Sequence, residues 1–214
     1  PVDLIEANLN DDDFADLIVS CQGDSTLRFY NGAEDTARAF VLDPSGLTQL
    51  DDPVGDIEPG DDNDDKVDIL VIVANPFGHT VTEVGRVAGI NGSGPWTVLG
   101  EPHEVGNRPV KVVASDINQD GFVDVIVSNF EDNSASILLR DSEEELSPQI
   151  ALPVGISPSS LAVVDFDGDG DKDIALIADN EEGESIVQIL RNDLNLTQDL
   201  IFASAQTYNE GQGP

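Results

Sequence analysis

The chain has 214 residues, enough for a sizeable hydrophobic core, and 39% of them are hydrophobic but only 5% aromatic. Its 43 acidic residues against 9 basic ones give a formal net charge of −34. This charge argues against nucleic acids and anionic membrane surfaces as partners, because both would repel the chain, and it suits the binding of cations.

Residue types that carry familiar catalytic chemistry are scarce. The single cysteine, Cys21, cannot form an intrachain disulfide, and we find no His/Cys metal cluster, Ser/His/Asp order or phosphate-binding loop in the sequence. No run reaches the length of a transmembrane helix, and we expect no signal peptide within these residues. Because the sequence lacks methionine altogether, we expect it to be a processed product or a segment of a longer protein.

Four repeats follow one another along the chain. Each is anchored by a proline seven residues before an acidic loop, and the anchors are Pro1, Pro53, Pro109 and Pro158. The anchors lie 52, 56 and 49 residues apart, and Pro214 follows 56 residues after the last. We therefore predict one domain, residues 1–214, of four whole repeats. The repeats cover residues 1–52, 53–108, 109–157 and 158–214.

Each repeat is predicted to contain four short strands. In the fourth repeat they cover residues 161–164, 174–178, 185–190 and 200–208. In the third repeat, the second and third strands cover residues 125–128 and 135–139. These runs are rich in β-branched residues, are separated by Gly, Asn and Asp clusters, and show no long helical period. The run at 161–164 is almost entirely apolar, which predicts burial on both faces between neighbouring repeats.

Short Gly-x-x-Pro segments close three of the four repeats. They begin at Gly106, Gly155 and Gly211 and end at the next repeat's anchor position. Glycine and proline at this spacing are typical of turns. The first boundary, Leu50-Asp51-Asp52-Pro53, has no such glycine.

An acidic loop lies between the first and second predicted strands of each repeat. Oxygen-bearing side chains at loop positions 1, 3, 5 and 9, with glycine at position 6, turn carboxylates towards one point. Calcium takes oxygen ligands and suits such a loop, and the backbone carbonyl at position 7 can add a ligand. The fourth loop is not an EF-hand, because its position 12 is Leu176 in a strand-like run instead of a glutamate.

The four loops match this pattern to different degrees. The first loop offers Asn8, Asn10, Asp12 and Asp16, with Asp13 at position 6. The second offers Asp62, Asp64 and Asp68, with Gly60 at position 1, Asp65 at position 6, and Glu58 or Asp61 as substitutes. The third offers Asp116, Asn118, Asp120, Phe122 and Asp124. The fourth offers Asp165, Asp167, Asp169, Asp171 and Asp173. We predict that the third and fourth loops hold Ca²⁺ well, the first less so and the second least.

The fourth repeat resembles the FG-GAP/VCBS repeat, the calcium-loop blade of integrin α-chain propellers and of many bacterial surface proteins. The resemblance runs from Pro153-Val154-Gly155-Ile156-Ser157-Pro158 through the loop to the strand at 186–190, and the third repeat matches nearly as well. It implies an all-β chain folded as a β-propeller of four-stranded blades, with calcium in the Asp-rich loops and an extracellular or cell-surface setting.

The number of blades separates two architectures. Family propellers more often carry seven blades, whereas four is the lower limit for a closed propeller. The four predicted blades therefore either close on themselves or form part of a larger ring. We expect closure, because an open half would leave two apolar blade faces in water.

Two functions remain open from the sequence. The first is a non-enzymatic extracellular calcium-binding module with a structural or adhesive role, which self-associates or binds other extracellular proteins and can assemble into a surface filament or matrix. The second is a carbohydrate-binding or polysaccharide-active propeller, a lectin or lyase, in which paired carboxylates carry out acid–base chemistry. We favour the first, because acidic residues are so common that no catalytic pair stands out, and His79 and His103 fit surface loops. We therefore predict no catalytic residue, no cofactor other than Ca²⁺, no nucleic-acid partner and no membrane insertion.

Overall fold

The computed structural model describes residues 3–7, 14–32, 40–50, 54–60, 68–73, 80–86, 96–141, 145–193, 202 and 206–209. Across these residues the chain forms strands and turns without a helix, as the sequence predicts. This part of the chain therefore contains no helix that is long and apolar enough to cross a membrane. The chain divides into two compact units, Pro1–His103 and Glu104–Pro214.

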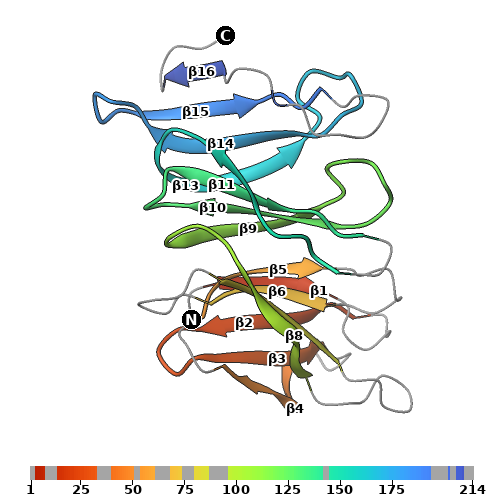
Figure 1. Cartoon of the computed structure of the whole chain (residues 1–214). Helices are drawn as coiled ribbons and strands as arrows, with labels where there is room; N and C mark the ends of the chain where they lie inside the picture. Colours follow the sequence, from red (N-terminus) through yellow and green to blue (C-terminus); the bar gives the residue numbers. More distant parts are fainter. Residues whose placement is uncertain are drawn as a thin grey trace. The chain divides into compact units, whose positions relative to one another are not determined.

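Each unit contains two four-stranded antiparallel sheets, and each sheet keeps its strands in sequence order (Figure 1). The first sheet consists of β1 (Asp3–Ala7), β2 (Asp16–Cys21), β3 (Thr26–Gly32) and β4 (Phe40–Gln49). The second consists of β5 (Val54–Gly60), β6 (Asp68–Val73), β7 (Thr80–Arg86) and β8 (Trp96–Glu104). The third consists of β9 (Pro109–Ser115), β10 (Asp124–Asn129), β11 (Ser134–Leu138) and β12 (Ile150–Pro153). The fourth consists of β13 (Ile156–Val164), β14 (Asp173–Asp179), β15 (Ser185–Leu190) and β16 (Gln206–Asn209). Such meanders fit a β-propeller-like fold.

In the first unit, the sheet β1–β4 packs against β5 through β1 and β2. Burial alternates along β2, as expected for a strand with one covered face. A hydrogen bond joins the two sheets, because the backbone N–H of Ile57 donates to Oδ2 of Asp3 over 3.2 Å. The fully buried side chains of this unit include Ile18, Leu27, Phe29, Ile57 and Val81.

In the second unit, β13 packs against β9 and β10, so that one face of the fourth sheet covers one face of the third. The third sheet contributes Ile126 and Ile137 to the shared core, and the loop between β9 and β10 contributes Ile117. The fourth sheet contributes Leu161, Ile174, Leu176, Ala178, Ile186 and Leu190. All six residues of β10 are buried, so the second strand of the third sheet is covered on both faces.

The prediction that residues 161–164 are buried on both faces is wrong. Leu161 is only 6% exposed and faces the third sheet, but Val164 is 46% exposed on the opposite face of the strand. An apolar run reports the hydrophobicity of a strand, and the number of its covered faces depends on which sheets stack against it.

The two described Gly-x-x-Pro segments form the same turn. The residue before each proline, Arg108 in one and Ser157 in the other, has a positive φ, of 53° and 51°. The glycine is required in both by close packing, because a Cβ on Gly106 would lie 2.7 Å from the Asn129 side chain and one on Gly155 would lie 2.8 Å from the Cβ of Ala178. The motif thus marks a point where the chain passes tightly over the second strand of a sheet.

Replacing Gly155 by alanine is expected to lower the free energy of unfolding by about 1–3 kcal/mol, because the new methyl group overpacks the contact with Ala178. Chemical denaturation monitored by circular dichroism measures this loss. Gly23→Ala is the matched control, since a Cβ at Gly23 would meet no atom within 4 Å. Equal stability of the two variants would contradict the steric role of Gly155.

Candidate metal centre

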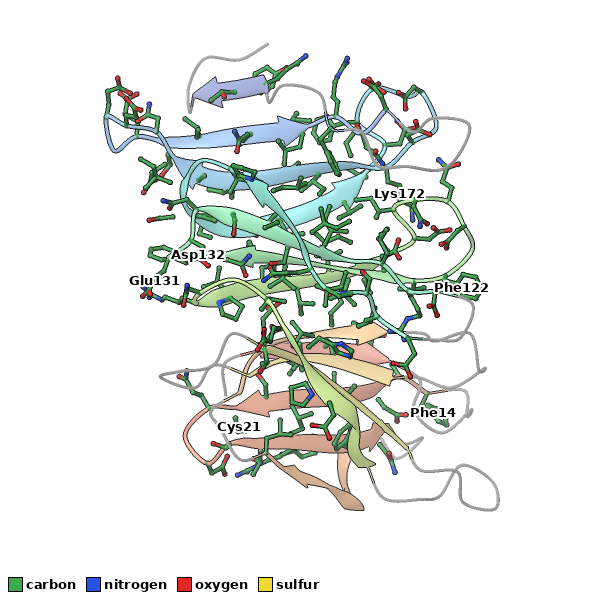
Figure 2. All side chains as sticks on the ribbon, viewed as in Figure 1. Phe14, Cys21, Phe122, Glu131, Asp132 and Lys172 are labelled. Atoms are coloured by element: carbon green, nitrogen blue, oxygen red, sulfur yellow. The ribbon has the colours of Figure 1, made fainter. Side chains whose placement is uncertain are left out.

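The acidic loops of the second unit lie at one end of its sheets. The third loop joins β9 to β10 and the fourth joins β13 to β14. Figure 2 shows Phe122 and Lys172 on this side, whereas Glu131 and Asp132, in the turn between β10 and β11, lie at the other end. Because both loops follow the first strand of their sheets, stacking of the sheets brings the two loops to the same end.

The fourth loop gathers three carboxylates. One oxygen each from Asp165, Asp167 and Asp173 lies within 4.8 Å of the others. Oxygens that bind one calcium ion at about 2.4 Å are at most roughly 4.8 Å apart, so this spacing fits a shared ion. Among the described His, Cys, Asp and Glu residues, no other group of three meets this spacing. The chemistry of the donor set, all carboxylate oxygen, is that of a hard cation such as Ca²⁺.

Hydrogen bonds within the fourth loop hold the turn. Asp165 accepts the backbone N–H groups of Gly168 and Gly170, at 2.7 and 3.1 Å. Both glycines have positive φ, 79° and 101°, which the loop needs and glycine tolerates. Asp169 accepts the N–H of Asp171 over 2.9 Å, and neither of these two side chains belongs to the three-carboxylate group. The structure therefore brings together positions 1, 3 and 9, and leaves position 5 in a local turn.

The third loop repeats this turn. Asp116 accepts the N–H groups of Asp120 and Gly121, each over 3.1 Å, and Gly121 at position 6 has a φ of 95°. At position 3, Asn118 is buried; its Oδ1 accepts the N–H of Asp120 and its Nδ2 donates to Oδ2 of that residue. Asp120 in turn accepts the N–H of Phe122 over 2.9 Å. Asn118 therefore supplies a neutral oxygen where the fourth loop has a carboxylate.

The aspartate at position 9 is buried in each of the three loops where it is described. Asp16, Asp124 and Asp173 are all 0% exposed. Each accepts a backbone N–H from the end of the third strand of its sheet or just beyond it. The donors are Gly32 to Asp16 (2.7 Å), Arg140 to Asp124 (2.9 Å) and Asn192 to Asp173 (2.9 Å). In the third and fourth loops the second oxygen accepts the N–H at loop position 2, from Ile117 (3.0 Å) and Phe166 (2.9 Å). Position 9 thus ties the loop to the third strand, in addition to any role as a ligand.

Burial raises the pKa of Asp124 from its ordinary value of 3.8 to about 6. Removal of the carboxylate from water is the main cause, and the charges of Asp120 and Asp116 raise the pKa further. The backbone N–H groups of Arg140 and Ile117 oppose this rise. A calcium ion in the loop would add a positive charge that stabilises the charged form of Asp124.

This pKa predicts a pH dependence of stability in the presence of a chelator. Between about pH 4 and pH 6 the folded chain holds a proton on Asp124 that the unfolded chain has lost, so the contribution of this group to the free energy of unfolding falls as pH rises through that window. The difference in unfolding free energy between the wild type and Asp124→Asn isolates the group, because the amide does not titrate. A difference that stays constant across the window would contradict the raised pKa.

Two neighbouring side chains also contact the fourth loop, and the sequence analysis did not single them out. Arg191 lies just after β15, and its Nη2 is 3.0 Å from Oδ2 of Asp167. The next residue, Asn192, is 0% exposed and donates its side-chain amide to the backbone of both loops. Arg191 neutralises part of the charge on Asp167, so an ion bound to this carboxylate would have to compete with Arg191. The only sequence signal for either residue is its place directly after the third strand.

The remaining predicted ligands belong to the first and second loops. Asn8, Asn10, Asp12 and Asp13 of the first loop, and Asp62, Asp64 and Asp65 of the second, lie outside the described residues. Of Asp68, only its place at the start of β6 is described. The predicted order of calcium affinity among the four loops therefore stays a prediction.

Comparisons with known proteins support the FG-GAP part of the resemblance over part of the chain. A family model described as FG-GAP-like repeat matches residues 83–176, which supports the FG-GAP family for this stretch. No curated protein matches the chain. A similar solved structure is the crystal structure of a functionally unknown protein from Desulfotomaculum acetoxidans DSM 771. The two share 14% sequence identity with a TM-score of 0.48, and the match covers 95% of this chain and 69% of the other.

Proposed function

We propose that this chain is a non-enzymatic, calcium-stabilised β-propeller module with a structural or adhesive role outside the cell. The observation that carries the proposal is the convergence of the Asp165, Asp167 and Asp173 carboxylates in a glycine-containing turn. Calcium bound there would offset their mutual repulsion and fix the connection between β13 and β14. Extracellular calcium modules work with dissociation constants of roughly 10⁻⁴–10⁻³ M, which suits a loop whose ligands are mostly exposed.

Calorimetric titration of the whole chain with Ca²⁺ tests this proposal. We expect binding with a dissociation constant of about 1 mM or tighter, and weaker binding of Mg²⁺, which demands near-ideal octahedral geometry. Asp165→Ala should remove one calcium equivalent. Calcium binding that is absent, or unchanged in this variant, would overturn the metal site.

The alternative, a polysaccharide-active enzyme, needs a carboxyl group with a raised pKa that can reach a substrate. Among the described carboxyl groups, Asp124 has a raised pKa, but its side chain is 0% exposed and accepts two backbone N–H groups. A buried carboxylate in this arrangement fits a structural role better than proton transfer to a glycan. We therefore place the non-enzymatic module first.

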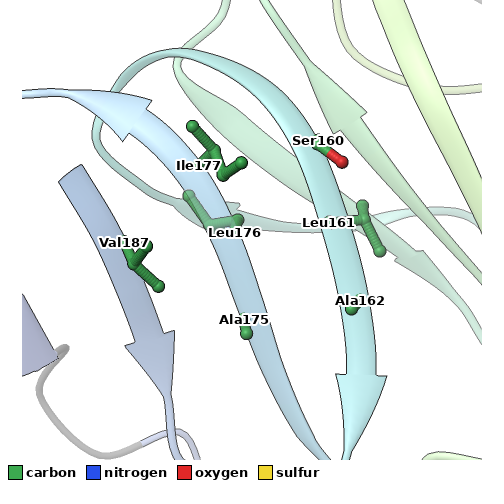
Figure 3. Close-up of a pocket in the computed structure, with 7 residues that line it drawn as sticks. All are labelled: Ser160, Leu161, Ala162, Ala175, Leu176, Ile177 and Val187. Carbon is green, nitrogen blue, oxygen red and sulfur yellow. The ribbon is translucent and has the colours of Figure 1, made fainter. Parts of the chain in front are cut away.

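The proposed self-association has a candidate surface on the fourth sheet. Ile177 is 46% exposed and Val187 37% exposed, and they line a shallow apolar hollow of about 160 Å³ (Figure 3). The other lining residues are Ser160, Leu161, Ala162, Ala175 and Leu176. Apolar faces of this kind on a protein surface mark sites of association.

The alignment of the third repeat with the fourth indicates what kind of partner would cover this apolar face. Val113 and Ile126 lie on the face of the third sheet that the fourth sheet covers, and the positions 49 residues later are Ala162 and Ala175 on the exposed face. The exposed face is therefore equivalent to one that another four-stranded sheet covers inside the second unit. We propose that a sheet from a second copy of the chain covers it.

The native mass of the chain, with calcium and with chelator, tests the proposed association. We expect a dimer or larger assembly that Ile177→Asp dissociates. Ile150→Asp, at an equally exposed isoleucine on β12, is the matched control and should leave the mass unchanged. A wild-type monomer would contradict a second copy and favour coverage within one chain.

A further inference from the structure

The third and fourth loops are joined by direct side-chain contacts. Gln119 stands at position 4 of the third loop, between the predicted ligands Asn118 and Asp120. Its Nε2 lies 2.8 Å from the backbone oxygen of Gly170 and 3.0 Å from Oδ1 of Asp171. A side chain of the third loop therefore holds positions 6 and 7 of the fourth loop from outside.

The backbone at Gln119 is consistent with a specific role for its side chain. Its φ is 60°, in the left-handed region that residues other than glycine, asparagine and aspartate rarely adopt. The inward side chains at positions 3 and 5 leave the position-4 side chain to point out of the third loop, where the fourth loop lies. A glycine would relieve the backbone but could not make either hydrogen bond.

Two more residues join the same loops. Asn192 donates its Nδ2 to the backbone oxygen of Ile117 in the third loop and to that of Lys172 in the fourth, each over 3.1 Å. Its own backbone N–H donates to Asp173, which belongs to the three-carboxylate group. Nζ of Lys172 lies 2.9 Å from Oγ of Ser115 at the end of β9. Gln119 and the fully buried Asn192 therefore connect the two loops directly, and Lys172 ties the fourth loop to the end of β9.

We infer that the third and fourth loops bind calcium as a coupled pair, with Gln119 as the positioning residue that links them. The inference rests on the proposed calcium function. Calcium in the fourth loop fixes the segment around Gly170 and Asp171, and this segment anchors Gln119 between two ligand positions of the third loop. Ordering one loop thereby lowers the entropic cost of ordering the other, which is positive cooperativity between two binding sites.

Amide NMR spectra of the full chain during calcium titration test the coupling site by site. Gly121 and Gly170 occupy position 6 of their loops, so their backbone amide signals report the third and fourth loops separately. We expect Asp165→Ala, which disables the fourth loop, to weaken calcium binding at Gly121 about fivefold or more, the lower end of typical coupling between sites. In a Gln119→Ala background, the same disabling substitution should change the affinity at Gly121 less than twofold.

Controls separate coupling from damage to the fold. Alanine keeps the Cβ of Gln119 and with it the backbone cost of the positive φ, and the two hydrogen bonds it loses are exposed, so Gln119→Ala should melt within about 2 °C of the wild type in chelator. Gln22→Ala, in the exposed turn after β2 of the first unit, should preserve the coupling. If disabling the fourth loop leaves the affinity at Gly121 unchanged in the wild type, the loops are independent and the inference is wrong while the calcium function stands. If neither glycine signal responds to calcium, both fail.

Discussion

Replacing Asp173 by alanine is expected to lower the free energy of unfolding by about 3 kcal/mol or more, even in the presence of a chelator. The carboxylate is 0% exposed and accepts the backbone N–H groups of Phe166 and Asn192. Alanine removes both hydrogen bonds to the carboxylate, each worth about 1.5–3 kcal/mol, and leaves the buried backbone N–H of Asn192 unpaired. Removing one negative charge from the loop offsets part of this cost, but the charges lie mostly in exposed positions where water screens them.

Chemical denaturation at fixed calcium and at fixed chelator concentration measures the effect. The loss should be larger in calcium, because the variant also lacks a predicted ligand. Asp193→Ala is the matched control, because Asp193 is an exposed aspartate shortly after β15. This substitution should change the unfolding free energy by less than about 0.5 kcal/mol. A loss at Asp173 that disappears in chelator would mean that position 9 acts only through the metal.

The sequence predicts the local geometry within the loops well, but it does not predict their contacts with the rest of the fold. Glycine at position 6 has a positive φ at both Gly121 and Gly170, as the tight turn requires. The carboxylates at positions 1, 3 and 9 of the fourth loop converge, as their spacing predicts. These features are local, because nine consecutive residues determine them, and local geometry follows directly from residue type.

Contacts between distant segments could not be predicted in the same way. The N–H donor to position 9 lies 16 residues downstream in the third repeat and 19 in the fourth, so no fixed spacing reveals it. Gln119 reaches the fourth loop 51 residues away only because two sheets stack in one register. Likewise, residues 161–164 are apolar throughout, yet one face of their strand is exposed, because the arrangement of sheets decides coverage.

The same substitution at Asp165 is expected to act only through calcium. In calcium-saturated buffer, Asp165→Ala should lower the melting temperature by roughly 5–10 °C. A ligand present at a hundred times its dissociation constant contributes about 2.7 kcal/mol, and each kcal/mol shifts the melting temperature of a chain of this size by about 2–4 °C. In chelator the effect should stay within about 1 kcal/mol, because Asp165 is exposed and water can replace it as acceptor for Gly168 and Gly170.

Two aspartates of one loop therefore distinguish a metal ligand from a structural anchor. Asp165 and Asp173 contribute oxygens to the same three-carboxylate group, but only Asp173 is buried against backbone donors. If calcium organises the loop, thermal unfolding of the two alanine variants should differ most in chelator, where Asp173→Ala remains destabilised and Asp165→Ala approaches the wild type. An equal loss for Asp165→Ala in calcium and in chelator would mean that the loop is a turn held by its own hydrogen bonds, and the calcium site would have to be abandoned.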